Sequence, residues 1–246
     1  FASGGQPAQV YLMARGGIKA GHAASIMVVK SILYEATVFI YSFVGFVVML
    51  PFFKTRVPHF VLLYYIGASI NLIVVLMYGL FLFKEETANR LLNVIFFFLK
   101  KIKISKKLDA FKSKLESGLE NFKEGAVKLK NRKGLAIRIF MLQLLQLTFL
   151  FSVPFFIYLA VEAKNPQYLK MLFAQSLSTL RVSFVPTPGS TGGAEGVGYL
   201  FFSVFFGKKI VIPVILMWRL LTYYANIIFG GLITLFSPEK PLDNVS

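Results

Sequence analysis

The chain alternates between long apolar runs and short polar interruptions. Two runs, residues 39–50 and 60–83, contain no charged residue. Because about 20 apolar residues suffice to cross the hydrocarbon core of a bilayer, such runs predict membrane-spanning helices. We predict spans at 23–50, 60–83, 135–161, 168–185 and 210–236, and an element at 197–206 that is too short to cross alone. The predicted fold class is all-α, a polytopic helical membrane protein.

Residues 186–198 interrupt this pattern with two prolines, five glycines and one acid. Proline lacks the backbone donor of a continuing helix, and glycine permits unusual backbone angles, so a helix must break here. Broken backbone at membrane depth is tolerated only where it is buried in protein or lines a hydrated cavity. We therefore predict re-entrant or broken helices around this Gly-rich motif. Its candidate substrate-binding residues are Gly189, Gly192, Gly193 and Glu195.

One long polar stretch, residues 84–134, holds 14 Lys and Arg against 6 Asp and Glu, a local net charge of +8 out of +16 for the chain. The positive-inside rule places this loop in the cytoplasm. Its apolar residues recur at steps of three and four between Leu108 and Leu129, which predicts an amphipathic helix. We expect this helix to rest on anionic lipids of the inner leaflet, with no nucleic acid as partner.

The composition agrees with a membrane protein, since 56% of residues are hydrophobic and only 15% are charged. The absence of Cys excludes disulfides and thiolate metal sites, and two isolated His form no ligand cluster. No Walker motif is present, so ATP is not the energy source of this chain. We predict no metal, no cofactor and no catalytic residue.

Four polar residues of the last span, Arg219, Thr222, Tyr223 and Asn226, are spaced to share one helical face. Arg219 lies about 14 Å along the helix from the start of the span, too deep for easy access to the interface. A charge at mid-bilayer costs about 2.5–3.5 kcal/mol, so Arg219 requires a partner or water. Glu195 is the nearest candidate. The pair either fixes helix packing or binds a charged lipid head group.

Two further charged residues are candidates for the same site. Arg181 precedes the Gly-rich break by five residues, and Glu35 lies inside the first predicted span. Glu35 either lines the cavity or serves as a packing partner. The chain starts at Phe1 rather than Met, and we expect it to begin within a longer protein.

Three motifs together resemble one family. They are Phe-Ala-Ser-Gly-Gly-Gln-Pro-Ala-Gln at 1–9, Pro-Thr-Pro-Gly-x-x-Gly-x-x-Glu-Gly at 186–196, and Trp-Arg-x-x-Thr-Tyr-Tyr at 218–224. The chain resembles, over nearly its whole length, the lysylphosphatidylglycerol synthase transmembrane family, the flippase-like membrane domain of multiple peptide resistance factors and of stand-alone relatives. The resemblance implies one flippase-like transmembrane domain over 1–246, with about two spans preceding Phe1.

The resemblance implies an inner-membrane lipid translocase that moves a phospholipid, an aminoacylated lipid or a polyprenyl-linked lipid between leaflets of the cell membrane. Two alternatives stay open: the membrane part of a phosphatidylglycerol lysyltransferase whose catalytic domain is not in these residues, and a non-transporting scaffold or lipid receptor. Ser3 and Gln6, in the first Gly-rich motif, are expected to face the second motif as broken elements of two repeats. The sequence leaves the oligomeric state open.

Overall fold

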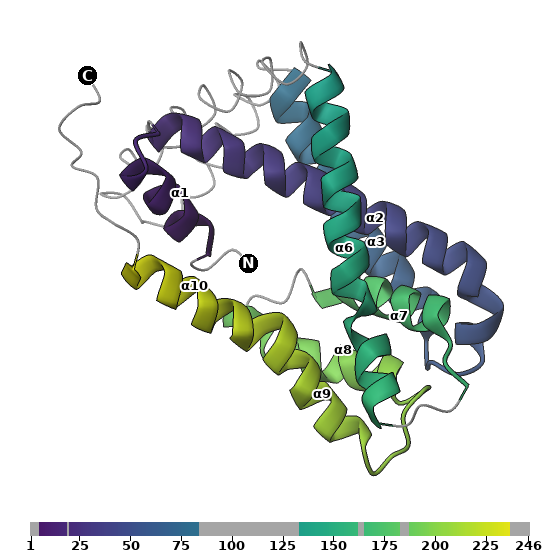
Figure 1. Cartoon of the computed structure of the whole chain (residues 1–246). Helices are drawn as coiled ribbons and strands as arrows, with labels where there is room; N and C mark the ends of the chain where they lie inside the picture. The colour runs from purple at the N-terminus through teal and green to yellow at the C-terminus, as the bar shows by residue number, and fades with distance from the viewer. Residues whose placement is uncertain (1–4, 19, 84–132, 162–164, 183–186, 237–246) are drawn as a thin grey trace, which may run out of the picture. The chain divides into compact units, whose positions relative to one another are not determined.

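The computed structural model describes residues 5–18, 20–83, 133–161, 165–182 and 187–236. Every regular element in these ranges is a helix (Figure 1). The elements are α1 (Gly5–Arg15), α2 (Ala20–Lys54), α3 (Phe60–Phe83), α6 (Lys133–Val161), α7 (Tyr168–Val182), the 3₁₀ turn η1 (Pro188–Ser190), α8 (Gly193–Phe202), α9 (Val211–Arg219), the π-helical turn η2 (Leu220–Tyr224) and α10 (Ala225–Phe236). The prediction of an all-helical fold is confirmed. Ser3 and residues 84–132 of the predicted basic loop lie outside the described residues, whereas the last two residues of that loop, Lys133 and Gly134, begin α6.

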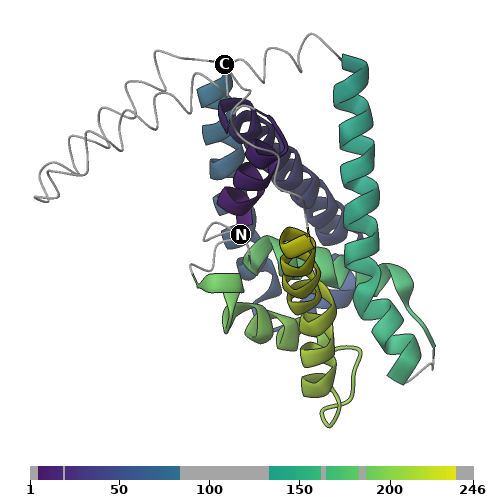
Figure 2. The ribbon, with the colours of Figure 1, turned by 60° about the vertical axis from the view of Figure 1, so that its left-hand side comes forward.

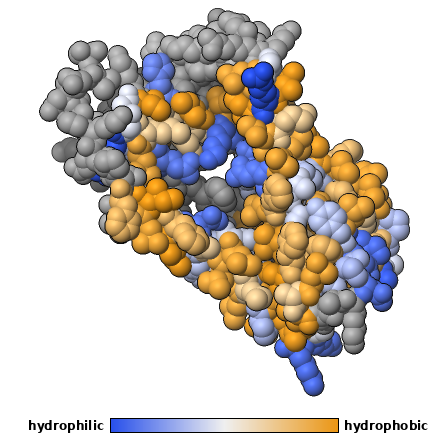
Figure 3. Space-filling model, in the orientation of Figure 1, coloured by the Kyte–Doolittle hydropathy of each residue, from blue (hydrophilic) through white to orange (hydrophobic). Residues whose placement is uncertain are grey.

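Three helical segments are long and apolar enough to cross a membrane: Val29–Lys54, Ile137–Val161 and Val211–Thr234. Helix α3 has the predicted bounds, and its segment Phe60–Leu76 is a shorter apolar stretch. On the face drawn in Figure 3, apolar residues cover the visible surface of α6 and α10. Phe236, the last residue of α10, is 82% exposed. Helices with such surfaces suit contact with lipid. The chain is a multi-pass membrane protein.

The predicted span at 168–185 coincides with helix α7 as far as Val182, and residues 183–185 lie outside the described residues. The 15 described residues of α7 extend about 22 Å at the rise of an α-helix, whereas the hydrocarbon core is about 30 Å thick. Eight residues of the helix are buried, including the five consecutive residues 174–178. Helix α7 is therefore mainly a packing helix.

The chain divides into two compact units. One comprises residues 6–33, 73–138 and 239–246, and so contains nearly all of α1, the start of α2, the end of α3 and the first turns of α6. In this unit Lys30 on α2 donates to Gln9 on α1, with 3.2 Å between Nζ and Oε1. Gly17, at φ +90°, permits the turn that follows α1.

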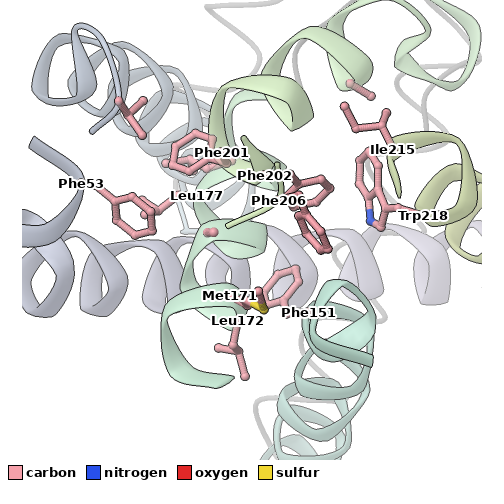
Figure 4. Close-up of a cluster of buried hydrophobic side chains, with 14 of the residues drawn as sticks. Phe53, Phe151, Met171, Leu172, Leu177, Phe201, Phe202, Phe206, Ile215 and Trp218 are labelled. Carbon is pink, nitrogen blue, oxygen red and sulfur yellow. The ribbon is translucent and has the colours of Figure 1, made fainter. Parts of the chain in front are cut away.

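The other unit comprises residues 1–5, 34–72 and 139–238 and contains the apolar core. Helix α8 packs between α7 and α9 (Figures 1 and 2). Figure 4 shows the centre of this core, where Phe201 and Phe202 of α8 lie among side chains from α2, α6, α7 and α9. The ring of Phe202 meets Trp218 of α9 edge-on at 5.4 Å. This packing joins the end of α8 to the end of α9, where Trp218 directly precedes Arg219.

Candidate functional site

The chain between α7 and α8 is broken as predicted. The described part of the break contains three residues with positive φ: Gly189 (+65°), Ser190 (+54°) and Gly192 (+87°). The turn is held locally, since Ser190 N–H donates to the Thr187 carbonyl at 2.8 Å and the Thr187 hydroxyl donates to the Thr191 carbonyl at 2.9 Å. Helix α8 begins at Gly193, earlier than the predicted 197. A re-entrant course through the membrane stays a prediction.

Glu195 lies in the first turn of α8 and caps that helix. Its Oε2 accepts the backbone N–H of Gly192 at 2.6 Å. Backbone N–H groups at a helix start have no partner within the helix, and a carboxylate there also interacts favourably with the helix dipole. The side chain of Glu195 is 32% exposed. One carboxylate oxygen is therefore used by the helix, and the group remains partly accessible.

Arg219 is the last residue of α9, and its side chain links α9 to the Gly-rich break. Its Nε lies 2.9 Å from Oε1 of Glu195, and Nη2 donates to the Gly189 carbonyl at 2.8 Å. The Nε–H group is buried and not aligned for a hydrogen bond, so its interaction with Glu195 is Coulombic. The side chain of Arg219 is only 7% exposed. The expected partnership of Arg219 with Glu195 is confirmed; whether the pair binds a substrate stays a prediction.

The ring of Tyr223 packs against the guanidinium of Arg219. The guanidinium carbon of Arg219 lies 4.6 Å from the centre of the Tyr223 ring, within the range of a cation–π interaction. A Cβ atom at Gly189 would collide with the same ring. Glycine is required at this position by both the close approach and the positive φ. The π-helical turn η2 carries Tyr223, and π turns occur frequently at functional sites.

Thr222 and Asn226 are not drawn into the same cluster. The Thr222 hydroxyl donates to the Trp218 carbonyl at 2.7 Å, and the Asn226 amide donates to the Thr222 carbonyl at 2.8 Å. Asn226 is exposed, and within the described part of the chain no hydrogen bond joins either side chain to Glu195 or Arg219. The predicted stripe assumed regular α-helical spacing, whereas the i→i+5 turn of η2 changes that spacing after Arg219.

Arg181, near the end of α7, has other neighbours. Its guanidinium donates to the carbonyls of Leu177 at 3.2 Å and Phe60 at 3.4 Å, and lies 4.6 Å from the centre of the Phe201 ring. In the described ranges no carboxylate lies within ion-pair distance of Arg181. Its role in substrate binding stays a prediction, and its observed contacts are those of a packing residue.

A family model for the "Lysylphosphatidylglycerol synthase TM region" matches residues 1–230. The chain belongs to this family. An archaeal relative in Archaeoglobus fulgidus, described as "UPF0104 membrane protein", is 25% identical over 253 residues, which cover 97% of this chain and 71% of the relative. No solved structure matches the chain. The resemblance drawn from the three motifs is confirmed.

In this member of the lysylphosphatidylglycerol synthase TM region family, the other acidic candidate, Glu35, has a different partner from the Glu195–Arg219 pair. Glu35 on α2 accepts a hydrogen bond from the amide of Asn71 on α3, with 2.7 Å between Nδ2 and Oε2. Sequence reasoning did not single out Asn71, although it is a polar residue within the charge-free run 60–83. Gln6 lies in the helical part of α1, and its expected contact with the second Gly-rich motif stays a prediction.

Proposed function

We propose that this chain is a lipid translocase module of the cell membrane that moves a phospholipid or a related phosphate-bearing lipid between leaflets. Its head-group site is the break between α7 and α8, where Glu195, Arg219 and Tyr223 converge with Gly189 and Gly192. The observation that carries the proposal is the ion pair of Glu195 and Arg219 at a non-helical segment of a membrane protein. This function includes no catalytic step.

The chemistry of the pair supports a lipid head group as ligand. The guanidinium of Arg219 has five N–H donors, and within the described residues the only hydrogen bond recorded for it goes to Gly189. A lipid phosphate therefore has donors available at Arg219, and it competes with Glu195 for the same charge. The amide of Gly192, at the start of α8, already donates to Oε2 of Glu195, so a phosphate that displaces this carboxylate gains a second donor there.

Glu195 extends the recognition to a cationic group. A carboxylate that is released from Arg219 by a phosphate becomes free to bind an ammonium group on the same lipid. A zwitterionic or aminoacylated phospholipid carries both charges and engages both partners. A polyprenyl-linked lipid phosphate engages only Arg219, so the two lipid classes are distinguished by their dependence on Glu195.

The partial exposure of Glu195 favours this role over a purely structural ion pair. Charged pairs at membrane depth that serve packing alone are expected to be enclosed on both sides, because each exposed charge is costly in hydrocarbon. Arg219 is enclosed, but about a third of the Glu195 side chain is not. An accessible carboxylate beside a buried guanidinium suits a site that a ligand enters from one side.

The test is a leaflet-resolved lipid flip assay in liposomes that contain the purified protein. The assay compares fluorescent phosphatidylglycerol, lysyl-phosphatidylglycerol, phosphatidylethanolamine and a polyprenyl phosphate. Wild-type protein should accelerate exchange of at least one of these lipids. Glu195→Gln should lose or change its lipid preference, since the neutral isostere keeps the volume and the helix cap but removes the charge.

Thr234→Val provides a matched control. Thr234 is partly exposed on α10, and its hydroxyl donates to its own helix at the Gly230 carbonyl, so this variant should flip lipid at the wild-type rate. If folded wild-type protein accelerates none of the four lipids, the translocase assignment is wrong, and a scaffold or lipid receptor replaces it. If Glu195→Gln flips every lipid as wild type does, the site assignment is wrong.

A further inference from the structure

A second polar site lies between α2 and α3 within the unit that holds the apolar core. Glu35 belongs to the candidate span Val29–Lys54, and Asn71 on α3 is fully buried. The Asn71 amide donates to Glu35 at 2.7 Å, but its Oδ1 atom is buried without a hydrogen-bond partner. A buried amide oxygen without a donor costs about 1–3 kcal/mol. The unpaired Oδ1 atom of Asn71 therefore calls for a hydrogen-bond donor.

Protonated Glu35 can supply this donor. An ionised carboxylate can only accept hydrogen bonds, whereas a protonated carboxyl group also donates one. A carboxylic acid and a primary amide have complementary donors and acceptors: the amide N–H bonds to one carboxyl oxygen, and the acid O–H bonds to the amide oxygen. Protonated Glu35 is thus the form that can satisfy Asn71 at both of its polar atoms.

The surrounding charges favour the same form. In the described ranges no Lys, Arg or His lies within ion-pair distance of Glu35, unlike Glu195, which has Arg219. Tyr34 is the titratable neighbour on α2 that interacts electrostatically with Glu35, and Asn71 is the polar group that faces it from α3. An unpaired charge in a membrane span is costly, and a bound proton removes that charge.

We propose that Glu35 and Asn71 form a proton-binding site, and that loading of this site is linked to lipid movement. A proton passes from water to the Glu35 carboxylate, is held against Asn71 Oδ1, and returns to water when the α2–α3 contact opens. Proton binding is independent of the function proposed above, whereas its link to lipid movement rests on that function.

Proton binding is tested by infrared difference spectroscopy of the reconstituted wild-type protein over a pH titration. We expect a protonated-carboxyl C=O band that shifts in D₂O, disappears at high pH and is absent in Glu35→Gln. Asn71→Leu should shift this band, because the amide hydrogen bonds are lost, and this variant keeps the test decisive if Glu35→Gln does not fold. Ser42→Ala is the control: Ser42 is buried on α2 and donates to its own helix at Val38, so the band should persist. Absence of a carboxyl band that responds to either Glu35→Gln or Asn71→Leu would overturn the proton site.

The link to transport is tested by the liposome flip assay with an imposed pH gradient. One proton per lipid predicts up to about a tenfold change in the equilibrium ratio of lipid between leaflets for each pH unit, and no change in Glu35→Gln. An infrared signal together with gradient-independent flipping would leave the proton site and the translocase intact and would refute the link. A response to a sodium gradient instead would show that the ligand is sodium. Failure of every lipid to flip would refute the translocase and the link, while the infrared result would still decide the proton site.

Discussion

Separating Glu195 from Arg219 should reveal how much this ion pair stabilises the break. The perturbation is a double-mutant cycle with Glu195→Gln, Arg219→Gln and the double variant. Glutamine at 195 retains an oxygen that can accept the Gly192 N–H, so the helix cap survives while the charge is lost. Arg219→Gln also removes the hydrogen bond to the Gly189 carbonyl. The cycle cancels these single-site effects and isolates the interaction between the two side chains.

The expected coupling follows from distance and exposure. Exposed ion pairs contribute about 0.2–1 kcal/mol, and loss of one partner of a fully buried pair costs about 3–5 kcal/mol. The Nε–Oε1 separation is 2.9 Å, Arg219 is 7% exposed and Glu195 is 32% exposed. The pair therefore lies between these limits, and we expect a coupling of about 2 kcal/mol, which is about thirtyfold in the unfolding equilibrium constant.

The chain contains its own probe for this measurement. Trp218 is the single tryptophan of the protein; it directly precedes Arg219 and contacts Phe202 of α8. Its fluorescence should report separation of α8 from α9 during unfolding in mixed detergent micelles titrated with sodium dodecyl sulfate. The midpoint and slope give the free energy of unfolding for each of the four proteins.

A second cycle that pairs Glu195→Gln with Thr234→Val serves as control, since independent sites add within about 0.3–0.5 kcal/mol. A coupling for Glu195 and Arg219 no larger than in this control would refute the reasoning. It would mean that solvent or lipid already screens the carboxylate, and that Arg219 is held mainly by Gly189 and Tyr223.

Two further substitutions test the surroundings of the pair. Gly189→Ala should lower the free energy of unfolding by more than about 2 kcal/mol, because the position has φ +65° and the new Cβ would meet the Tyr223 ring. Gly196→Ala is the control and should be neutral or stabilising, since a Cβ at this position meets nothing within 4 Å. Equal effects of the two substitutions in the same fluorescence-monitored unfolding would contradict the close approach of Gly189 to Tyr223. Arg181→Met should change the stability by less than about 2 kcal/mol. The variant loses the hydrogen bonds to the Leu177 and Phe60 carbonyls, but its apolar chain can still cover Phe201, and no carboxylate of the described residues pairs with Arg181. A larger loss would show that the charge or these hydrogen bonds are needed.

Much of the architecture was predictable because it depends on local chemistry. The charge-free run 60–83 coincides with α3, since the bilayer requires an unbroken apolar helix of about this length. The break was predictable because proline and glycine act on their own backbone. The partnership of Arg219 with Glu195 was predictable because a deep cation needs an anion or water, and Glu195 is an acid set between apolar segments in the Gly-rich break.

Other features depend on how helices rotate and approach one another, which spacing along the chain does not reveal. The π turn after Arg219 brings Tyr223 to the guanidinium and leaves Thr222 and Asn226 bonded to their own helix, because one changed hydrogen-bond step alters the direction of every later side chain. The contact of Glu35 with Asn71 joins residues 36 positions apart on two helices. Apolar patterns specify which helices form, but close packing in three dimensions decides which polar groups within them meet.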